Sequence, residues 1–381
     1  MVQPNPKILI GASIPRSGHH FLVGMLNLYF GSDLYYCETY TSANCCRKVP
    51  CSKRGDFGFV YQKSHDRDFR LPPDIGDALY VIQYRHPVAE ALSDRELDIK
   101  DAVGRPSLNF RRSREGFLIW LAAKAVYYRR FHDKWMAKRL ANGIYLDYDA
   151  LAANPAQALG GIVSRVAGNV DELRVAAATG GDIVRHRVRV ASESPYYDAE
   201  LMAALEDFVV KRCPSFGFSR TFGGDYSQSA LYGLILLRDP SEPLPKGENK
   251  RFKFAASLAP DHPEVLRRQG VRLLREGKQA QAVQALAALV ERYPFYAEGY
   301  QYLLKACAEA KEQVPESALS GNALLACAHR PELLLALEGV FRARGYVVNA
   351  LAASALAAAV NREGDASPDE SDDADATSRR R

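Results

Sequence analysis

Apolar and polar residues near the start of the chain fall into two successive patterns. An apolar run from Lys7 to Ala12 is typical of a buried strand, and Ser13–Gly18 is typical of a tight turn. A helix is expected from His19 onward, because apolar residues then recur three and four apart, at Leu22, Met25, Leu26 and Tyr29. The stretch therefore predicts a strand, a turn and a helix N-terminus.

The same order of elements recurs further along the chain. Leu79–Tyr84 predicts a strand, Arg85–Pro87 a turn, and the residues from Val88 onward a helix. Phe59–Gln62 predicts a strand that delivers three residues to a turn, namely Lys63, Ser64 and His65. Further expected elements are a helix over 110–139, a strand at Tyr145, and helices over 156–167, 171–179 and 198–211. Alternating strands and helices indicate an α/β domain with a parallel sheet.

The interval 31–58 carries no sustained period and is expected to be irregular, and the helical pattern weakens over 94–108. Within 31–58, Tyr35, Tyr36 and Tyr40 either stack on a sugar or pack a loop, and the pattern does not decide between these roles.

Beyond Pro260 the chain becomes rich in Ala and Leu and helical in pattern. The motif that begins at Pro260 restarts at Pro294, and a looser third unit runs from His329 to Val360. This period, with a Gly-Lys turn between paired helices, resembles a tetratricopeptide repeat. The resemblance implies either a groove for a peptide or subunit, or a support for the domain before it.

Composition narrows the class of protein only modestly. The 381 residues are 47% hydrophobic and 25% charged, with a net charge of +5, as in an ordinary globular protein. That charge does not indicate nucleic-acid binding. No apolar run approaches the ~18 residues of a membrane helix, and the first residues lack a signal-sequence pattern, so a cytoplasmic location is expected.

Four of the seven cysteines fall close together, at Cys37, Cys45, Cys46 and Cys51. Their spacing is not the paired C-x2-C of common zinc sites. Free thiols, disulfides and a bound metal all remain open, and the spacing favours free thiols.

The first turn has the chemistry of an anion site. Amide groups at a helix N-terminus are unpaired and the helix dipole adds positive potential, to which Arg16 adds a full charge. The turn is not a Walker A loop, because Gly18 is followed by His19 and His20 instead of Lys and a hydroxyl residue. A basic residue, Arg85, also ends the later strand, where kinases usually place an acid for magnesium.

These motifs together resemble the sulfotransferases that use 3′-phosphoadenosine 5′-phosphosulfate. Pro15–Gly18 resembles their 5′-phosphosulfate loop, and Arg85–Ser93 resembles their 3′-phosphate motif. Lys63–His65, followed by Leu71-Pro72, resembles their Lys-Thr-His segment, and Tyr145–Pro155 resembles the strand and loop after their central helices. The four motifs occur in the order of the family.

The resemblance implies a role for each matching residue. The phosphosulfate would be held by Pro15, Arg16, Ser17 and Gly18, and the 3′-phosphate by Arg85 and Ser93. His65 would be the general base on an acceptor hydroxyl, with Lys63 and Arg16 near the transferring group. A basic segment near Arg187 would cover the nucleotide, and no metal would be required. His19 and His20 stand where the family often has threonine, and Arg16 where many members have lysine.

The fold expected from the resemblance is a P-loop-like, parallel-sheet α/β sulfotransferase domain followed by an all-α helical repeat domain. The predicted boundaries are 1–222 for the catalytic domain, 223–259 for a linker, 260–360 for the repeats and 361–381 for a disordered acidic tail. The acceptor would be a hydroxyl, on a carbohydrate or small metabolite or on a protein tyrosine, and the repeats would offer a surface to a protein or peptide partner.

Two other functions remain open at this stage. An atypical kinase would need acids near the loop to hold magnesium, and the nearby candidates are Asp66, Asp68 and Asp94. A non-enzymatic interaction protein would use the repeats and retain a degenerate nucleotide-binding domain, for which the replacement by His19 and His20 is the best support.

Overall fold

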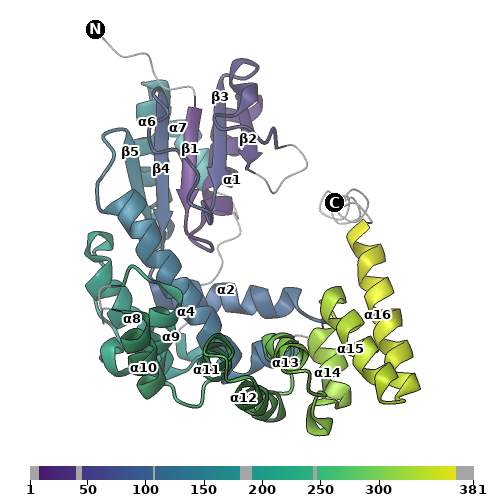
Figure 1. Ribbon diagram of the computed structural model, residues 1–381. Coiled ribbons are helices and arrows are strands. Elements are labelled where there is room, and N and C mark those ends of the chain that lie inside the picture. Colours follow the sequence, from purple (N-terminus) through teal and green to yellow (C-terminus); the bar gives the residue numbers. More distant parts are fainter. Residues whose placement is uncertain (1–7, 40–44, 106–107, 181–190, 243–246, 366–381) are drawn as a thin grey trace. The chain divides into compact units, whose positions relative to one another are not determined.

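The structure is a computed structural model that describes residues 8–39, 45–105, 108–180, 191–242 and 247–365 (Figure 1). The chain divides into two compact units. Unit 1 comprises 1–98 and 121–241, and unit 2 comprises 99–120 and 242–381. The division falls within two helices, α2 (Pro87–Asp101) and α4 (Arg114–Phe131), so each of them contributes residues to both units.

Unit 1 is built on a five-stranded sheet in which every paired strand is parallel. The order is β2-β3-β1-β4-β5, and the strands are β1 (Ile8–Ser13), β2 (Leu34–Glu38), β3 (Phe59–Ser64), β4 (Ala78–Tyr84) and β5 (Gly143–Asp147). The expected α/β class with a parallel sheet is therefore confirmed. The chain visits strands on one side of β1 and then on the other, which makes the carboxyl end of β1 the place where such sheets bind ligands.

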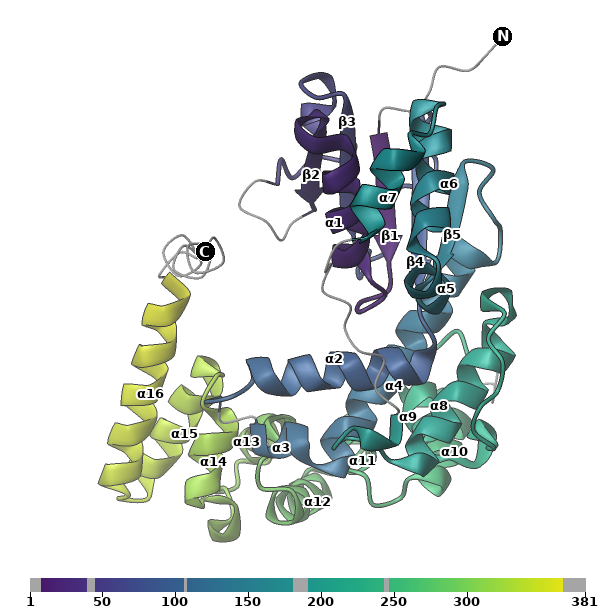
Figure 2. The same ribbon diagram turned by 180° about the vertical axis from the view of Figure 1, so that it is seen from behind.

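Helices cover both faces of this sheet. On one face lie α1 (His19–Phe30), α6 (Pro155–Ala167) and α7 (Glu172–Gly180), which stand in front of the strands in Figure 2. Apolar side chains of these helices join alternate strand residues, such as Leu9 and Val81, in one buried cluster. On the other face the indole of Trp135, in the π-helical turn η3 (His132–Met136), packs 5.7 Å from the ring of Tyr80.

Unit 1 contains three further helices in its described part. They are α5 (Tyr148–Ala153), α8 (Ala199–Arg212) and α9 (Ala230–Arg238). Short 3-10 turns lie at Gly31–Asp33, Ser52–Gly55, Ala191–Glu193, Pro214–Phe216 and Tyr226–Gln228.

Several sequence predictions need correction. The interval 31–58 was expected to be irregular but contains β2, which pairs with β3. The strand predicted to end at Gln62 continues through Lys63 and Ser64 as β3. The helix that begins at Pro87 extends to Asp101, into the interval in which the helical pattern of the sequence weakens. The single helix expected over 110–139 is instead α3 (Leu108–Arg112), α4 and the π-helical turn.

Unit 2 contains the helical repeats. Its helices are α3, α10 (Glu248–Leu258), α11 (Pro263–Arg275), α12 (Gln279–Arg292), α13 (Ala297–Ala310), α14 (Gly321–Cys327), α15 (Pro331–Ala343) and α16 (Val347–Asp365), with a 3-10 turn at Glu316–Ala318. The interval expected to be a linker, 223–259, therefore holds α9 and α10.

The predicted period is visible in the helix starts. Three helices of unit 2 begin at Pro263, Ala297 and Pro331, at intervals of 34 residues. Neighbouring helices pack side by side through a continuous apolar core. At Gly270 an added Cβ would lie 2.5 Å from Leu286, so α11 and α12 approach too closely for any side chain there. Among the described residues, no helix combines the length and the hydrophobicity needed to cross a bilayer.

Candidate functional site

The loop between β1 and α1 has a backbone shaped for an anion. Arg16 and Gly18 both adopt left-handed conformations, with φ of 58° and 84°. An added Cβ at Gly18 would lie 2.6 Å from the Tyr148 ring, so glycine is required there for space as well as for conformation. The first helical hydrogen bond joins Leu22 N to Gly18 O, which leaves the preceding amides at the open end of α1. Such a turn binds phosphate or sulfate.

Ser17 stabilises this loop from within. Its buried hydroxyl lies 2.5 Å from Ile14 O and 3.3 Å from Gln83 O, to either of which it can donate. Ile14 N donates in turn to Gln83 O at 3.0 Å, and this ties the loop to β4. Pro15 is buried beside these contacts. The Ser17 hydroxyl is thus engaged by the loop, and what it can offer an anion is its backbone amide.

The two phosphate motifs predicted from the sequence meet at this loop. Arg16 Nε donates to Ser93 Oγ at 3.1 Å, across 77 positions of the chain. Arg85 Nη1 donates to Arg16 O at 3.3 Å, so the guanidinium of Arg85 lies directly beneath the loop. Residues that were expected to contact different phosphates of one donor are therefore neighbours.

Arg85 is a buried cation that forms no ion pair among the described residues. Its exposed fraction is only 7%, and its guanidinium stacks over the Tyr148 ring at 4.2 Å. Within the described part of the chain, no carboxylate lies within ion-pair distance of it, and its Nε has no hydrogen-bond partner. A buried charge without a counter-ion is costly, so this position favours an anionic ligand.

Lys63, His65 and Glu38 form a second group beside the loop. Lys63 Nζ is fully buried and lies 2.7 Å from Glu38 Oε1 and 2.7 Å from His65 Nε2. The register of β2 on β3 places Glu38 opposite Lys63. On its other side, His65 Nδ1 lies 2.9 Å from Ser13 O, and Tyr127 OH donates to His65 O at 2.5 Å. The imidazole is thereby held at the carboxyl end of β1.

Burial determines the protonation states of Lys63 and His65. Burial, reinforced by the neighbouring Lys63 charge, lowers the pKa of His65 to about 3, so its imidazole is neutral at pH 7. Burial also lowers the pKa of Lys63 to about 8, although Glu38 opposes this shift. The ammonium therefore donates to His65 Nε2, and the imidazole proton resides on Nδ1 and is donated to Ser13 O.

His19 adds an unsatisfied polar group to the same place. Its buried ring lies edge-on to the His65 ring at 5.0 Å, and its Nε2 has no hydrogen-bond partner in the described structure. Burial and the nearby charge of Lys63 hold the pKa of His19 far below its usual value. Its neighbour His20 is exposed, with its ring 3.9 Å from that of His19. His19 is therefore a neutral imidazole that offers one nitrogen to a ligand.

Three groups of the kind that bind metals converge here, on His19, Glu38 and His65, with ligand atoms within 4.8 Å of one another. The ammonium of Lys63 is hydrogen-bonded to Glu38 and His65. In this conformation Lys63 supplies the positive charge that a metal ion would supply.

The acids required by a kinase are committed elsewhere. Asp66 accepts from Lys134 Nζ at 2.6 Å, from Trp135 Nε1 at 2.9 Å and from Leu71 N at 2.8 Å, so both of its oxygens are used. Asp94 pairs with Lys124 at 2.5 Å, and Asp68 is exposed beside Arg70.

Sequence reasoning missed Glu38, Tyr127 and Tyr148. Glu38 lies in the interval expected to be irregular, and the aromatic and apolar run Leu34–Cys37 is the signal that could have revealed its strand. Among the tyrosines proposed for sugar stacking, Tyr35 stacks on Phe57 at 4.9 Å and Tyr36 donates to Glu38 at 2.9 Å. Arg187 and Tyr40 lie outside the described residues.

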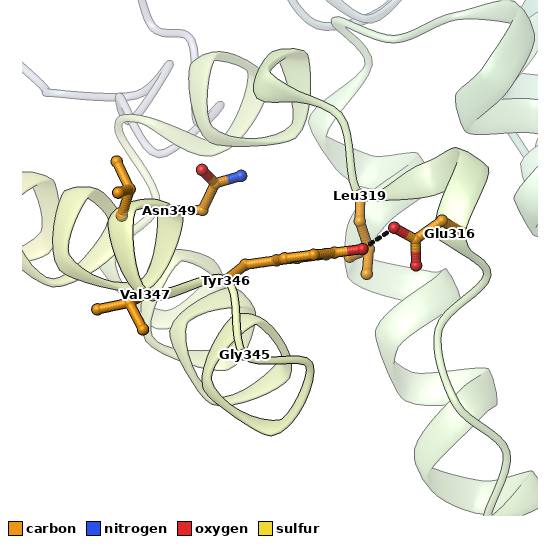
Figure 3. Close-up of a pocket in the computed structure, with 7 residues that line it drawn as sticks. Glu316, Leu319, Gly345, Tyr346, Val347 and Asn349 are labelled. Carbon is orange, nitrogen blue, oxygen red and sulfur yellow. Dashed lines mark hydrogen bonds between the residues drawn. The ribbon is translucent and has the colours of Figure 1, made fainter.

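Unit 2 contains a separate open depression of about 450 Å³. Figure 3 shows the ring of Tyr346 extending across it, with the hydroxyl donating to Glu316. It is lined by Glu316, Leu319, Gly345, Tyr346, Val347, Val348 and Asn349. With a single carboxylate and mostly apolar neighbours, the depression is suited to binding and carries no acid–base pair for catalysis.

No family model matches the chain, and neither the curated proteins nor the solved structures contain a match to it.

Proposed function

We propose that the protein is a sulfotransferase that transfers the sulfuryl group of 3′-phosphoadenosine 5′-phosphosulfate to an acceptor hydroxyl. The observation that supports this most directly is the convergence of Arg16, Ser93 and Arg85 on one loop. Arg85 lacks an acidic partner in the described structure, and Arg16 donates to a hydroxyl that can turn to a phosphate. Two cations and a ring of amides suit a donor with anionic groups at both ends.

The donor would lie across the loop. In this proposal the amides at the start of α1 and Arg16 bind the phosphosulfate, and Arg85 and Ser93 bind the 3′-phosphate. Catalysis of sulfuryl transfer then rests on positioning and on positive charge around an in-line transition state. A covalent intermediate on the protein is not needed.

The proton of the acceptor would pass to His65. As the acceptor oxygen bonds to sulfur and the bond from sulfur to the phosphate oxygen breaks, His65 Nε2 takes the hydroxyl proton. The lone pair of His65 Nε2 that would take this proton accepts a hydrogen bond from Lys63 Nζ at 2.7 Å. The proposal therefore includes a movement of the Lys63 ammonium from His65 toward the transferring group, where it stabilises the departing phosphate. The acceptor is proposed to be a hydroxyl on a carbohydrate or small metabolite.

Calorimetry with the spent donor, adenosine 3′,5′-bisphosphate, tests the donor site without knowledge of the acceptor. Metal-independent binding is expected, and Arg85→Ala should weaken it by about 30- to 100-fold, because a charge-assisted contact of ~2–3 kcal/mol is lost. Arg174→Ala, an exposed arginine whose guanidinium pairs with Asp171, is the matched control and should bind as the wild type does.

The outcomes separate the competing functions. Preference for ATP with magnesium would favour a kinase, and no nucleotide binding at all would favour a non-enzymatic protein. If binding is found, His65→Ala should retain it and lose sulfuryl transfer, since a general base contributes about 10²- to 10⁴-fold. Full turnover by that variant would remove His65 from the mechanism.

We also propose that unit 2 binds a protein or peptide partner. Apolar side chains on the first turns of α16 are strongly exposed, with Val347 at 64%, Val348 at 78% and Leu351 at 58%, and they adjoin the depression beside Tyr346. If this surface is used, Val348→Glu should abolish peptide capture from a displayed library and leave donor binding unchanged. Unchanged peptide capture by Val348→Glu would contradict the proposal.

A further inference from the structure

Three cysteines that lie within 15 residues of one another in the sequence also meet in space, at the edge of the sheet in unit 1. Cys37 lies on β2, and Cys46 and Cys51 lie in the segment that leads to β3. Their sulfur atoms all lie within 4.8 Å of one another, and the Cys46 and Cys51 sulfurs are 3.5 Å apart. We propose that Cys37, Cys46 and Cys51 form a binding site for a thiophilic divalent cation of the Zn²⁺ class.

The separations fit such an ion. Zinc binds thiolates at about 2.3 Å in tetrahedral geometry, which places neighbouring sulfurs about 3.8 Å apart. Sulfur separations of 3.5 Å and up to 4.8 Å lie on both sides of this value, so only small side-chain shifts would bring the three atoms onto one ion. Cys37 and Cys51 are buried and Cys46 is half-buried, and a water molecule would complete the tetrahedral coordination.

One backbone amide points at the cluster, as in metal–thiolate turns. Ser52 N donates to Cys46 Sγ at 3.4 Å. This hydrogen bond would stabilise a thiolate at Cys46, the form that binds a metal.

The segment that carries the cysteines is held firmly on the sheet. Gln62, which is buried on β3, accepts from Cys51 N at 2.8 Å and donates to Lys48 O at 2.6 Å. The register of the sheet also places Gln62 opposite Cys37. One amide side chain thus fixes the cysteine segment beside the strand that bears the third thiol.

A disulfide accounts for these observations less well. A bond between Cys46 and Cys51 would leave Cys37 without a partner beside it, whereas a metal ion uses all three sulfurs. The ion would also anchor the end of β2, one residue before Glu38. The inference does not depend on the proposed sulfotransferase activity.

The test uses the full chain, purified under reducing conditions and stripped with a chelator. Zn²⁺ is titrated in competition with a chromophoric chelator, and Co²⁺ is added separately because its thiolate charge-transfer absorption reports the number of sulfur ligands. One ion per chain is expected, with the absorption of three thiolates. Cys37→Ser, Cys46→Ser and Cys51→Ser should each weaken Zn²⁺ binding by about 100-fold or more.

Cys307→Ser, at a buried cysteine of unit 2, is the matched control and should leave binding unchanged. The cobalt spectrum of the wild type remains informative if a variant fails to fold. The proposal is overturned by the absence of thiolate charge transfer in the reduced wild type, or by folded cluster variants that bind Zn²⁺ as tightly as the control. Recovery of a Cys46–Cys51 disulfide without metal from cells lysed in an alkylating agent would also overturn it.

Discussion

Two of the buried cations of unit 1, Lys124 and Arg85, differ in the partners that surround them. The ammonium of Lys124 on α4 lies 2.6 Å from Glu90 and 2.5 Å from Asp94, so two carboxylates of α2 surround it. The guanidinium of Arg85 has no carboxylate within ion-pair distance in the described chain and contacts a carbonyl and a tyrosine ring. A buried cation that stabilises the fold has an acidic partner within the protein. A buried cation without an ion-pair partner is suited to binding an anionic ligand.

The largest expected effect is on the free energy of unfolding, and it comes from removing Lys124, which has two acidic partners. Lys124→Met leaves Glu90 buried without its cation, and the free energy of unfolding should fall by about 3 kcal/mol. Urea unfolding of the full chain measures this change. Lys305→Met is the control, since that lysine of α13 is 62% exposed and should change stability by no more than about 0.5 kcal/mol. Equal effects of the two substitutions would mean that the buried cluster does not stabilise the fold.

A second effect concerns the two buried imidazoles beside the loop. His19 and His65 stay neutral in the folded protein well below pH 6.5, because their pKa values are lowered by burial and by Lys63. Below pH 6.5 the unfolded chain binds more protons than the folded chain, so stability falls as the pH falls. Lowering the pH from 7 to 5 should reduce the free energy of unfolding by about 2 kcal/mol for each imidazole.

Urea unfolding at the two pH values measures this loss. His65→Gln should reduce the pH dependence of the free energy of unfolding by about 2 kcal/mol. An unchanged pH dependence of the free energy of unfolding in His65→Gln would show that this imidazole titrates normally in the folded protein.

A third effect tests Lys63 in the proposed reaction. Its pKa is lowered to about 8 by burial, so the ammonium is lost as the pH rises through that value. If the charge stabilises the departing phosphate, the rate of sulfuryl transfer should fall about tenfold for each pH unit above 8. Lys63→Met should be slower at pH 7 and should lack this alkaline limb. A rate that continues to rise above pH 9 would exclude the charged lysine from the reaction.

The smallest expected effect is on stability at Arg85. Because its charge lacks an acidic partner, Arg85→Met should leave the free energy of unfolding unchanged or raise it by about 1 kcal/mol when no anion is present. Adenosine 3′,5′-bisphosphate should then stabilise the wild type and not the variant. A large loss of stability in Arg85→Met without ligand would show that Arg85 belongs to the fold in the same way as Lys124.

Local patterns predicted the elements around the loop well. The runs Ile8–Ala12 and Leu79–Ile82 are short and apolar, as central parallel strands must be, and both were found within strands. The edge strand β2 was missed because it is only five residues long and lies among turn formers, in an interval without a sustained hydrophobic period.

Long-range contacts explain the remaining errors. Lys63 was placed in a turn because a charged residue normally avoids a buried strand. Its burial depends on Glu38, 25 residues earlier on a strand that the sequence did not reveal. The contact between Arg16 and Ser93 likewise follows from the sheet order and from no local spacing. The residues of the candidate site could be chosen from sequence, but their partners could not.

The most direct test of the central claim is a thermodynamic cycle between Arg85 and the 3′-phosphate. Calorimetry would compare the binding of adenosine 3′,5′-bisphosphate and adenosine 5′-phosphate to the wild type and to Arg85→Met. The account predicts that the wild type gains about 2–3 kcal/mol from the 3′-phosphate and that the variant gains almost none. An equal gain in both proteins would contradict it, because the 3′-phosphate would then bind elsewhere.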